Sequence, residues 1–458
     1  MTTMELHPAA VADLPPGPRQ SSFWQLLRYS LWAPDFLEDC HRRYGDPFTI
    51  DLFRHGKLVL LSSPDAVRDV FRGDPEALHS GEGNEFLSLS VGRNSVLVLD
   101  GPPHARQRRV LLPPLKGERM RSFFAAMRQA TLDESAAWPE GKPIRMDEPM
   151  RQITLRVILQ AVLGLPVDEQ LVRIERIVHE MLKYSRSRWS LFTVKMISPE
   201  FARKNAHRIG FFRELSKLDA EIYRLLAERR QLPPEAQGDD VLAALLAARH
   251  EDGQPLADEE IRDGIVTMLV AGHETTSIAL CWALEQIARH PEAVQRLQNE
   301  LQATCGSELP APADLENLKF LDAAIRESLR IRTILPFVVR KTKRPFVAGG
   351  REYPPGVLLS PCSHLIHRRE DLYPQPHEFR LERFLERKFS PYEWFPFGGG
   401  NRHCLGMPFA LYEMQVVLST LLTRFNVQRP AGWRSRYARK GIVLAPHDGA
   451  RVIVNRRR

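Results

Sequence analysis

The sequence predicts a mainly α (α+β) fold, in which one helix-rich domain carries small β-sheets near one edge. Three observations predict it. From about Asp65 to Arg332 the pattern is mainly helical, with breaks that contain proline or glycine. One segment, from about Asp258 to His290, would be about 50 Å long at roughly 1.5 Å per residue, enough to cross a whole domain. Short β-like runs flank the helical part on both sides, and no shift in composition requires a domain boundary. We therefore expect a single domain over residues 1–458.

The beginning of the chain combines an extended segment, a helix and a hairpin. Residues 1–20 are expected to be extended, because Leu14–Arg19 is rich in proline. A helix-like segment around Trp24–Tyr44 follows. Two β-like runs come next, with a turn at His55-Gly56 between them: Phe48–Phe53 and Lys57–Ser62.

The helical part is divided by four breaks, which lie at Gly101–Pro103, Pro113–Pro114, Leu232–Asp240 and Cys305–Asp314. Its longest segment contains IVTMLVAG, which is apolar on nearly every side, so we expect that helix to lie in the core. Beyond Arg332 we expect two short strands, a long irregular stretch and a last apolar helix. These are Val338–Lys341, Val357–Ser360, Tyr373–Asn401 and Leu405–Phe425.

Composition excludes several classes of protein. Hydrophobic residues make up 43% of the chain, which is too many for a disordered protein. No apolar run approaches the roughly 18 to 20 residues that span a bilayer, and the N-terminus has no apolar h-region. We therefore expect a cytoplasmic protein without a membrane anchor. The five cysteines are widely spaced and form no CxxC, which argues against a disulfide framework or a zinc ribbon.

The net charge of +8 leaves two interpretations open. A basic chain can bind nucleic acid, but this one has no zinc finger, no RNP-type strand and no basic run interleaved with aromatic residues. A basic docking face for an acidic protein partner explains the charge equally well. We therefore expect no nucleic-acid partner.

The segment FPFGGGNRHCLGMPF places one cysteine, Cys404, just before the last helix. A helix N-terminus offers free backbone N–H groups and a positive potential, and both favour thiolate over thiol. The three glycines let the backbone approach a flat ligand closely. A flexible linker would not be framed by Phe397 and an apolar helix, and a phosphate loop would continue into Gly-Lys-Ser/Thr.

The spacing FxxGxRxCxG resembles the haem-binding loop of the cytochrome P-450 family, and every defining position matches: Phe397, Gly400, Arg402, Cys404 and Gly406. The resemblance implies a haem-thiolate monooxygenase of the soluble bacterial type, with the P-450 fold and haem b as cofactor. It makes Cys404 the axial ligand of the iron, whose thiolate favours cleavage of the O–O bond. By the same resemblance Phe397 packs beside the sulfur, Arg402 meets a haem propionate and Gly406 belongs to the cofactor site.

A second motif, AGHETT, lies inside the long helical segment. Ala271 and Thr275 are four residues apart and share a helix face. An interior glycine followed by two threonines predicts a local opening of the helical hydrogen-bond ladder. His273-Glu274 begins HExxH, but Ser277 replaces the second histidine, so a zinc protease is excluded. The motif resembles the family's oxygen-binding motif, which implies that Glu274 and Thr275 deliver protons to dioxygen and that Ala271 lies against the haem.

Glu327 and Arg330 form an ExxR pair on one face of a predicted helix. Such a pair is usually a solvated surface ion pair that contributes about 1 kcal/mol or less. Together with Arg383 in FRLERF, it resembles the buried three-residue network of the family. That resemblance implies a structural role and no catalysis.

His104 and Arg108 are four apart in PPHARQRR and share a helix face. Two cations aimed at one place suit a dianionic ligand, although a basic surface helix would look the same. The family places a similar HxxxR pair at the haem propionates. Arg340, four residues after Pro336, matches a further propionate-binding arginine.

The resemblance also assigns the substrate pocket to five segments: 86–96, 181–197, 266–275, 334–338 and 442–444. The lining would be mostly apolar, which favours a hydrophobic substrate such as a fatty acid, terpenoid or steroid. The expected lining residues are Leu87, Leu89, Val270, Leu335, Phe337 and Val338. Lys57 or Arg54, in the early hairpin, would hold a substrate carboxylate at the channel mouth.

The reaction implied is the insertion of one oxygen atom of O2 into a C–H or C=C bond. No flavin or ferredoxin domain fits beside a haem domain in 458 residues, so we expect a monomer that receives electrons from a separate ferredoxin or flavodoxin with its NAD(P)H reductase. The docking face would include Arg106, Arg109, Lys116 and Arg326.

Three alternatives stay open. The first is a peroxide-dependent or isomerising haem-thiolate enzyme, against which the intact acid–alcohol pair argues. The second is a haem sensor or carrier without turnover. The third, suggested by the basic charge alone, is a nucleic-acid-binding protein without haem.

Overall fold

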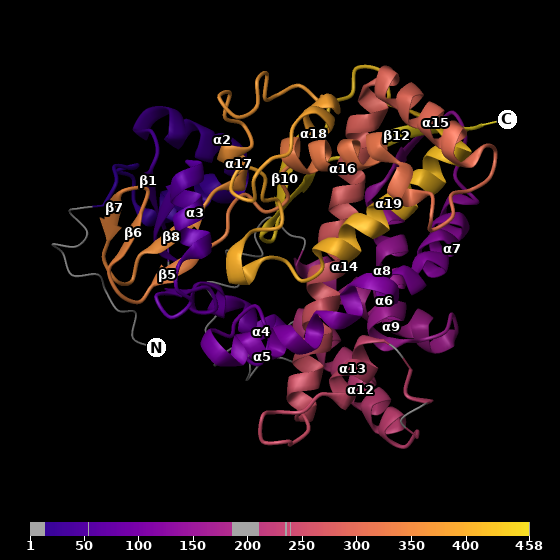
Figure 1. Ribbon diagram of the computed structural model, residues 1–458, viewed down its shortest axis with the longest axis horizontal. Helices are drawn as coiled ribbons and strands as arrows, with labels where there is room; N and C mark the ends of the chain where they lie inside the picture. The colour runs from indigo at the N-terminus through magenta and orange to yellow at the C-terminus, as the bar shows by residue number, and fades with distance from the viewer. Residues whose placement is uncertain (1–13, 54, 186–209, 234–235, 239, 458) are drawn as a thin grey trace.

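The computed structural model describes residues 14–53, 55–185, 210–233, 236–238 and 240–457. Helices make up most of the described chain, and the sheet that contains β1, β5 and β8 lies at the left in Figure 1 together with the hairpin of β6 and β7. The long helix α14 (Asp258–Arg289) runs through the helical part. The structure confirms the predicted mainly α fold with small sheets, but the sheets are not all near one edge, because the sheet that contains β12 (Arg451–Arg456) lies on the other side of the molecule.

Most helices lie between the two sheet-forming parts of the chain. Before α14 the structure has α2 (Ser22–Tyr44), α3 (Pro64–Arg72), α4 (Ser88–Val91), α5 (Gly101–Leu111), α6 (Gly117–Ser122), α7 (Phe124–Ser135), α8 (Asp147–Leu163), α9 (Glu169–Ser185), α12 (Gly210–Arg230) and α13 (Val241–Ala247). After it come α15 (Pro291–Cys305), α16 (Lys319–Ile331), α17 (Ser363–Ile366), α18 (Glu382–Glu386) and α19 (Met407–Arg424). Short 3-10 turns include η1 (Glu82–Leu87), η2 (Pro113–Leu115), η5 (Leu315–Asn317) and η6 (Gly400–Arg402).

Helix α14 is the centre of the core, as its composition predicted. Three acidic residues in its first turn suit the positive end of the helix dipole, and Glu260 Oε2 accepts a hydrogen bond from Ala257 N at 2.9 Å. Pro291 ends the helical path and starts α15. The helix is long and apolar enough to cross a membrane by composition alone, but 72% of its most apolar stretch is buried inside the protein. It packs against α8, α16 and α19 in the largest apolar cluster.

The largest sheet joins strands from distant parts of the chain, in the order β1-β2-β8-β5-β3. Strands β1 (Phe48–Leu52) and β2 (Gly56–Leu61) form the expected antiparallel hairpin. Strand β2 pairs in parallel with β8 (Leu358–Pro361), where Leu58 lies opposite Leu358. Strands β5 (Arg340–Thr342) and β3 (Leu78–His79) complete the sheet. Helix α2 covers this sheet, and its buried side chains pack with those of the strands in a second apolar cluster.

Several strands were not predicted. The last predicted helix ends at Arg424, and Phe425 already begins strand β9 (Phe425–Gln428). Strand β12 (Arg451–Arg456) pairs with both β9 and β4 (Pro143–Arg145). Two hairpins complete the set: β6 (Phe346–Ala348) with β7 (Arg351–Tyr353), and β10 (Tyr437–Lys440) with β11 (Val443–Pro446). Most of these strands are three or four residues long, which is too short for a periodic pattern to show in the sequence.

Candidate functional site

Cys404 lies in a short loop between η6 and α19. Backbone hydrogen bonds fix the loop: Cys404 N donates to Phe397 O at 3.0 Å, and His403 N donates to Gly400 O at 3.1 Å. The Phe397 ring packs against Trp394 at the edge of the main core. Cys404 is exposed, although the next residue, Leu405, is buried. The thiol therefore faces an accessible space instead of packing into the core.

The glycines of this loop allow close packing within the protein. Gly398 and Gly400 have φ of +66°, which only glycine adopts without strain. A Cβ on Gly399 would lie 2.2 Å from the Phe71 ring, and one on Gly400 would lie 2.2 Å from Phe71 O. Gly399 and Gly400 therefore allow helix α3 to approach the loop closely, and the expected approach of the loop to a flat ligand stays a prediction.

The expectation that the helix N-terminus favours the thiolate of Cys404 also needs correction. Helix α19 begins only at Met407. Although the residue as a whole has accessible surface, desolvation by the surrounding protein raises the pKa of the Cys404 thiol. The backbone N–H groups of Gly406 and Met407 and the charge of Arg108 lower the pKa, but to a smaller extent. The free side chain is thus a thiol, and a bound metal cation is what would deprotonate it.

Ala271 is exposed on α14, although most of the residues on either side of it in this helix are buried. Val270 and Gly272 beside it are half-buried. Ala271 and Cys404 thus belong to neighbouring parts of the fold, because α14 packs against α19. Each presents an accessible surface within elements that otherwise form the core.

The predicted opening of α14 at AGHETT is absent, since the helix runs unbroken from Asp258 to Arg289. Thr275 Oγ1 donates to Ala271 O at 2.8 Å, and Thr276 Oγ1 donates to Gly272 O at 2.8 Å. Both hydroxyls turn back onto their own helix and add a second donor to carbonyls that keep their place in the ladder. Thr275 and Ala271 do share one face, as their spacing predicted.

Glu274 borders a cluster of charged side chains. Ile278, one turn further along the helix, packs against Val443 of β11, and Val443 pairs with Lys440 of β10. Lys440 Nζ lies 3.8 Å from Asp147 Oδ2. Burial lowers the pKa of Lys440, while the carboxylates of Asp147 and Glu274 act in the opposite direction. Glu274 is therefore in electrostatic contact with a partly buried cation.

The predicted propionate-binding residues come together from three parts of the chain. His104 and Arg108 lie on α5, Arg340 on β5 and Arg402 on η6. Burial, reinforced by Arg402, lowers the pKa of Arg340 to about 9. Burial and Arg108 lower the pKa of Arg402 to about 10, while Asp100 opposes the change. Arg340 and Arg402 are thus each close enough to another arginine for its positive charge to lower their pKa.

The sequence suggested that His104 is a second cation beside Arg108, but the structure indicates a neutral ring. Burial, followed by the charges of Arg402 and Arg108, lowers the pKa of His104 to about 4. The ring is therefore neutral at pH 7 and offers a hydrogen-bond donor instead of a charge. Among the predicted residues, the arginines supply the positive charge of this cluster.

The cluster fits a dianionic ligand such as the two propionates of haem. Asp100 is the one carboxylate that raises the pKa of His104, Arg340 and Arg402. The single negative charge of Asp100 leaves two of the three arginine charges without a counter-charge. In addition, Arg402 Nε is buried without a hydrogen-bond partner among the described residues. Two further carboxylates would offset the excess charge and provide acceptors for guanidinium groups.

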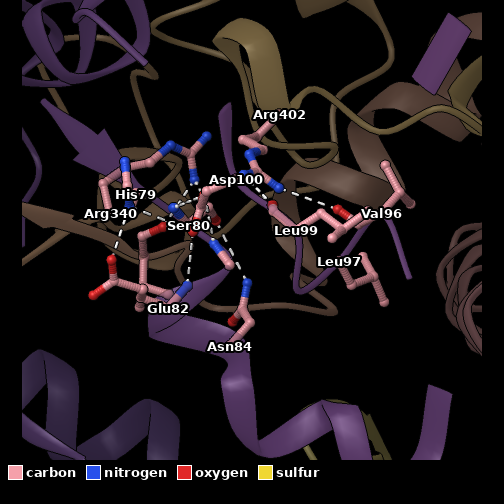
Figure 2. Close-up of polar contacts among 12 residues, drawn as sticks. His79, Ser80, Glu82, Asn84, Val96, Leu97, Leu99, Asp100, Arg340 and Arg402 are labelled. Carbon is pink, nitrogen blue, oxygen red and sulfur yellow. Dashed lines mark hydrogen bonds and ion pairs between the residues drawn. The ribbon is translucent and has the colours of Figure 1, made fainter. Parts of the chain in front are cut away.

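Sequence reasoning missed Asp100. Its position just before the Gly-Pro-Pro start of α5 is typical of a helix N-cap, which was the available signal. The structure shows no such cap, because the side chain of Asp100 makes no capping bond to α5. Its carboxylate instead meets Arg402 and the backbone of residues 80–82 (Figure 2).

The structure brings Glu327, Arg330 and Arg383 together in the interior. Arg330 donates from Nε and Nη2 to the two carboxylate oxygens of Glu327, at 2.7 Å each, and neither side chain is exposed. Arg383 Nε reaches Glu327 Oε1 at 3.1 Å. Arg330 also donates to the carbonyls of His367 and Pro376 at 2.7 and 2.8 Å. The network therefore ties α16 to the segment that leads to the cysteine loop.

The predicted substrate residues are all half-buried, and that they line one pocket stays a prediction. Leu335, Phe337 and Val338 pack at the edges of three different apolar clusters. Val270 packs at the edge of the main core. Leu87 and Leu89 lie on η1 and α4.

The proposed carboxylate anchors have a simpler explanation. Lys57 Nζ lies 3.3 Å from Asp51 Oδ2 in the same hairpin, which is an ordinary pair at the surface. Arg54 and residues 186–197 of the predicted pocket lie outside the described residues.

The predicted docking residues are on the surface to different extents. Arg109 and Lys116 are exposed, and Arg109 lies 3.5 Å from Glu251. Arg106 and Arg109 border a cavity of about 540 Å³. Arg326 pairs with Asp322 at 2.6 Å and stacks on Trp394. Neither this cavity nor one of about 650 Å³ beside the end of α14 contains a predicted substrate residue.

Comparison with known proteins gives one consistent family. The family model described as Cytochrome P-450 matches residues 15–451. A putative cytochrome P-450 135B1 of Mycobacterium tuberculosis (strain ATCC 25618 / H37Rv) is 36% identical over 444 residues, which are 96% of this chain and 91% of the relative. A putative cytochrome P-450 138 of the same strain is 33% identical over 452 residues, which are 98% of this chain and 97% of the relative.

Solved structures show the same fold. Retinoic acid-bound cyanobacterial CYP120A1 superposes with a TM-score of 0.83 at 24% identity, over 97% of this chain and 99% of that one. The heme domain of cytochrome P-450DA gives a TM-score of 0.84 at 22% identity, over 97% of both chains.

Proposed function

This chain belongs to the cytochrome P-450 family and is a haem-thiolate monooxygenase, and from that premise we propose how its own residues hold the haem and serve the reaction. Cys404 binds the iron of haem b through its sulfur. Arg108, Arg340 and Arg402, with His104 as a neutral donor, bind the haem carboxylates. Three further residues border the ring: Phe397, Ala271 and Gly406. The whole of residues 1–458 serves as one haem domain.

When bound, the haem and its thiolate supply the O2 activation that inserts one oxygen atom into a C–H or C=C bond. The protein contributes protons. Thr275 Oγ1 lies on the face of α14 that Ala271 exposes. In the structure its hydroxyl donates to Ala271 O, so it would have to turn away from that carbonyl to pass a proton into the open space. Glu274 returns a proton to Thr275, and its carboxylate is in electrostatic contact with Lys440.

The proposed substrate is hydrophobic, of the fatty acid, terpenoid or steroid class. Apolar side chains contributed by several elements support this, since a mostly apolar pocket selects an apolar ligand. The proposed electron donor is a separate ferredoxin or flavodoxin with its NAD(P)H reductase. We propose that this protein is a cytoplasmic monomer. The exposed cations Arg109 and Lys116 would attract an acidic partner.

One observation carries these residue assignments: Cys404 is accessible and lies close enough to Arg108 for its charge to lower the pKa of the thiol. The loop that carries Cys404 also adjoins a cluster of arginines whose positive charges outnumber the nearby carboxylates. The test is the absorption spectrum of the reduced protein with carbon monoxide. We expect a thiolate-type spectrum that Cys404→Ser abolishes. The control is Cys362→Ser, because Cys362 is buried and its Sγ donates only to Pro336 O. An unchanged spectrum in the Cys404 variant would refute the assignment.

The substrate class has its own test. A panel of fatty acids, terpenoids and steroids is titrated into the ferric protein, and displacement of the iron's water is read as a spectral shift. We expect saturable shifts with at least one apolar class and none with polar molecules of similar size.

A further inference from the structure

Asp100 connects parts of the haem site that are far apart in the chain. Its carboxylate accepts three backbone hydrogen bonds from the turn that leads into η1 (Figure 2). Ser80 N and Gly81 N donate to Oδ1, and Glu82 N donates to Oδ2, each at 2.9 Å. Three donors on one carboxylate hold it in a single orientation, because each bond to an ionised group is stronger than a neutral one.

The same carboxylate forms an ion pair with Arg402, whose side chain is almost fully buried. Arg402 also donates to two carbonyls of the segment that precedes Asp100, Val96 O at 3.1 Å and Leu99 O at 2.5 Å. One edge of the guanidinium is thus fixed by this segment. A planar guanidinium with one edge fixed has a defined direction for its remaining donors, and Nε remains without a partner among the described residues.

The second arginine of the site meets the same turn. Arg340 Nη1 lies 3.2 Å from Ser80 Oγ, and its Nη2 donates to Gly399 O at 3.1 Å in the cysteine loop. Ser80 Oγ donates to Val339 O at 3.1 Å. The turn at residues 80–82 therefore lies between the two arginines, and Asp100 holds this turn and one of the arginines at once.

There is no spare room around the carboxylate. A Cβ on Gly81 would lie 2.3 Å from Val98 O and 2.7 Å from Asp100 Oδ2. The backbone of the turn therefore packs directly on Asp100, at a distance that only a glycine at position 81 allows.

We propose that Asp100 is a positioning residue of the haem site, which fixes Arg402 and the Ser80–Glu82 turn relative to each other so that Arg402 and Arg340 bind the two haem carboxylates. This inference rests on the proposed function. It adds that the affinity for haem depends on a carboxylate that does not touch haem but acts through Arg402. Because the turn continues into η1 and α4, the same carboxylate ties the segment carrying Leu87 and Leu89 to the haem carboxylates.

The experiment compares Asp100→Asn with a matched control in the same turn, Glu82→Gln. Glu82 is also a charged partner of this turn, but it bonds to His79, Lys341 and Lys343 and to neither arginine of the site. Haem loss to excess apomyoglobin is measured on each holoprotein. We expect Asp100→Asn to release haem roughly tenfold faster, as the loss of a charge-assisted hydrogen bond implies, and Glu82→Gln to match the parent. Equal rates in the two variants would overturn the proposal.

A double-variant cycle tests whether Asp100 acts through Arg402. In an Arg402→Met background, Asp100→Asn should accelerate haem loss far less than it does in the parent, because its target is gone. A full additional acceleration would contradict a positioning role. The ferric–ferrous potential gives a second readout: removing this negative charge should shift it to more positive values in Asp100→Asn and leave it unchanged in Glu82→Gln.

If Asp100→Asn does not accumulate as folded protein, Asp100→Glu provides a second test, since the longer side chain keeps the charge but cannot keep both the bonds to the turn and the pair with Arg402 in their present geometry. Faster haem loss in Asp100→Glu would support the positioning role of Asp100, and an unchanged rate would oppose it. The parent spectrum separates this inference from the proposed function. A parent without a thiolate-type carbon monoxide spectrum refutes the function itself, whereas a normal parent with an unaffected Asp100 variant refutes only the role of Asp100.

Discussion

Arg330 and Glu327 form a doubly hydrogen-bonded ion pair, with two N–O distances of 2.7 Å, from which solvent is completely excluded. A pair of this kind is costly to break, because removal of one partner leaves the other charged and buried. The remaining contacts of Arg330 go to backbone carbonyls between residues 367 and 378. The pair therefore holds α16 and the following irregular segment as one unit.

We predict that Glu327→Gln lowers the free energy of unfolding by about 3 to 5 kcal/mol, since Arg330 then lacks its counter-charge. Asp322→Asn is the matched control: on the same helix, Asp322 forms an i,i+4 pair with Arg326 in which both side chains are about one-third exposed. Its loss should change stability by about 1 kcal/mol or less. Urea denaturation followed by circular dichroism measures both free energies of unfolding. Equal effects would show that burial does not determine how much an ion pair contributes to stability.

Thr275→Ala should keep the haem and its thiolate spectrum while wasting electrons as hydrogen peroxide, because in the proposed function the hydroxyl at this position supplies the proton. The control is Thr276→Ala. Thr276 makes the same 2.8 Å bond to the carbonyl four residues earlier, but it is buried. The ratio of product to NAD(P)H consumed, with peroxide measured in parallel, distinguishes the two. Full coupling in Thr275→Ala would refute its role in proton delivery.

Gly399→Ala should destabilise the cysteine loop by about 1 to 3 kcal/mol, the usual cost of an overpacked core. The new Cβ would lie 2.2 Å from the Phe71 ring, while the backbone of Gly399 is extended and suits any residue. The cause is therefore space and not conformation. Phe71→Leu should relieve part of the clash, so that the double variant loses less stability than the sum of the single variants. Additive losses would contradict this explanation.

Stability should fall on mild acidification because of buried neutral histidines. Burial lowers the pKa of His364 from 6.5 to about 4, so its ring is neutral at pH 7 and shares a 2.9 Å hydrogen bond with Glu38 in place of an ion pair. The unfolded chain binds the proton first. The stability contributed by the neutral ring is therefore complete above about pH 6.5 and is lost as the pH falls toward 4, by up to about 3 kcal/mol.

The variant His364→Gln tests this assignment, because its amide can donate to Glu38 without titrating. The free energy of unfolding is measured from pH 7 to pH 4 for both proteins. The difference between parent and variant should shift in favour of the variant as the pH falls. A constant difference across this range would exclude His364 as the source.

The sequence predicted the parts of the fold that depend on local patterns. The long helix around Ala271 was predicted to within one residue, since a continuous apolar run is visible without knowledge of its neighbours. The loop around Cys404 was located by its fixed spacing. The family and the fold class were also predicted, and the comparisons and the structure confirm them.

The rest depends on contacts between distant segments. Asp100 was missed because its partners, residues 80–82 and Arg402, lie 18 to 20 and 302 positions away. The charge of His104 was misjudged because burial, which the sequence does not show, decides it. The close packing of Gly399 and Gly400 against Phe71 was not predicted, because Phe71 lies in a distant part of the chain.

The parallel pairing of β2 with β8 has a consequence for synthesis. Leu58 cannot pair with β8 until Leu358 has been synthesised, because the partner strand is 300 residues further along the chain. At about 5 to 20 residues per second, the ribosome needs roughly 15 to 60 s to deliver it. During that time the apolar edge of the early hairpin has no neighbour and is open to pairing with other chains. We expect nascent chains that stop before Leu358 to require a chaperone, and full-length chains to be released from it once this strand has been added.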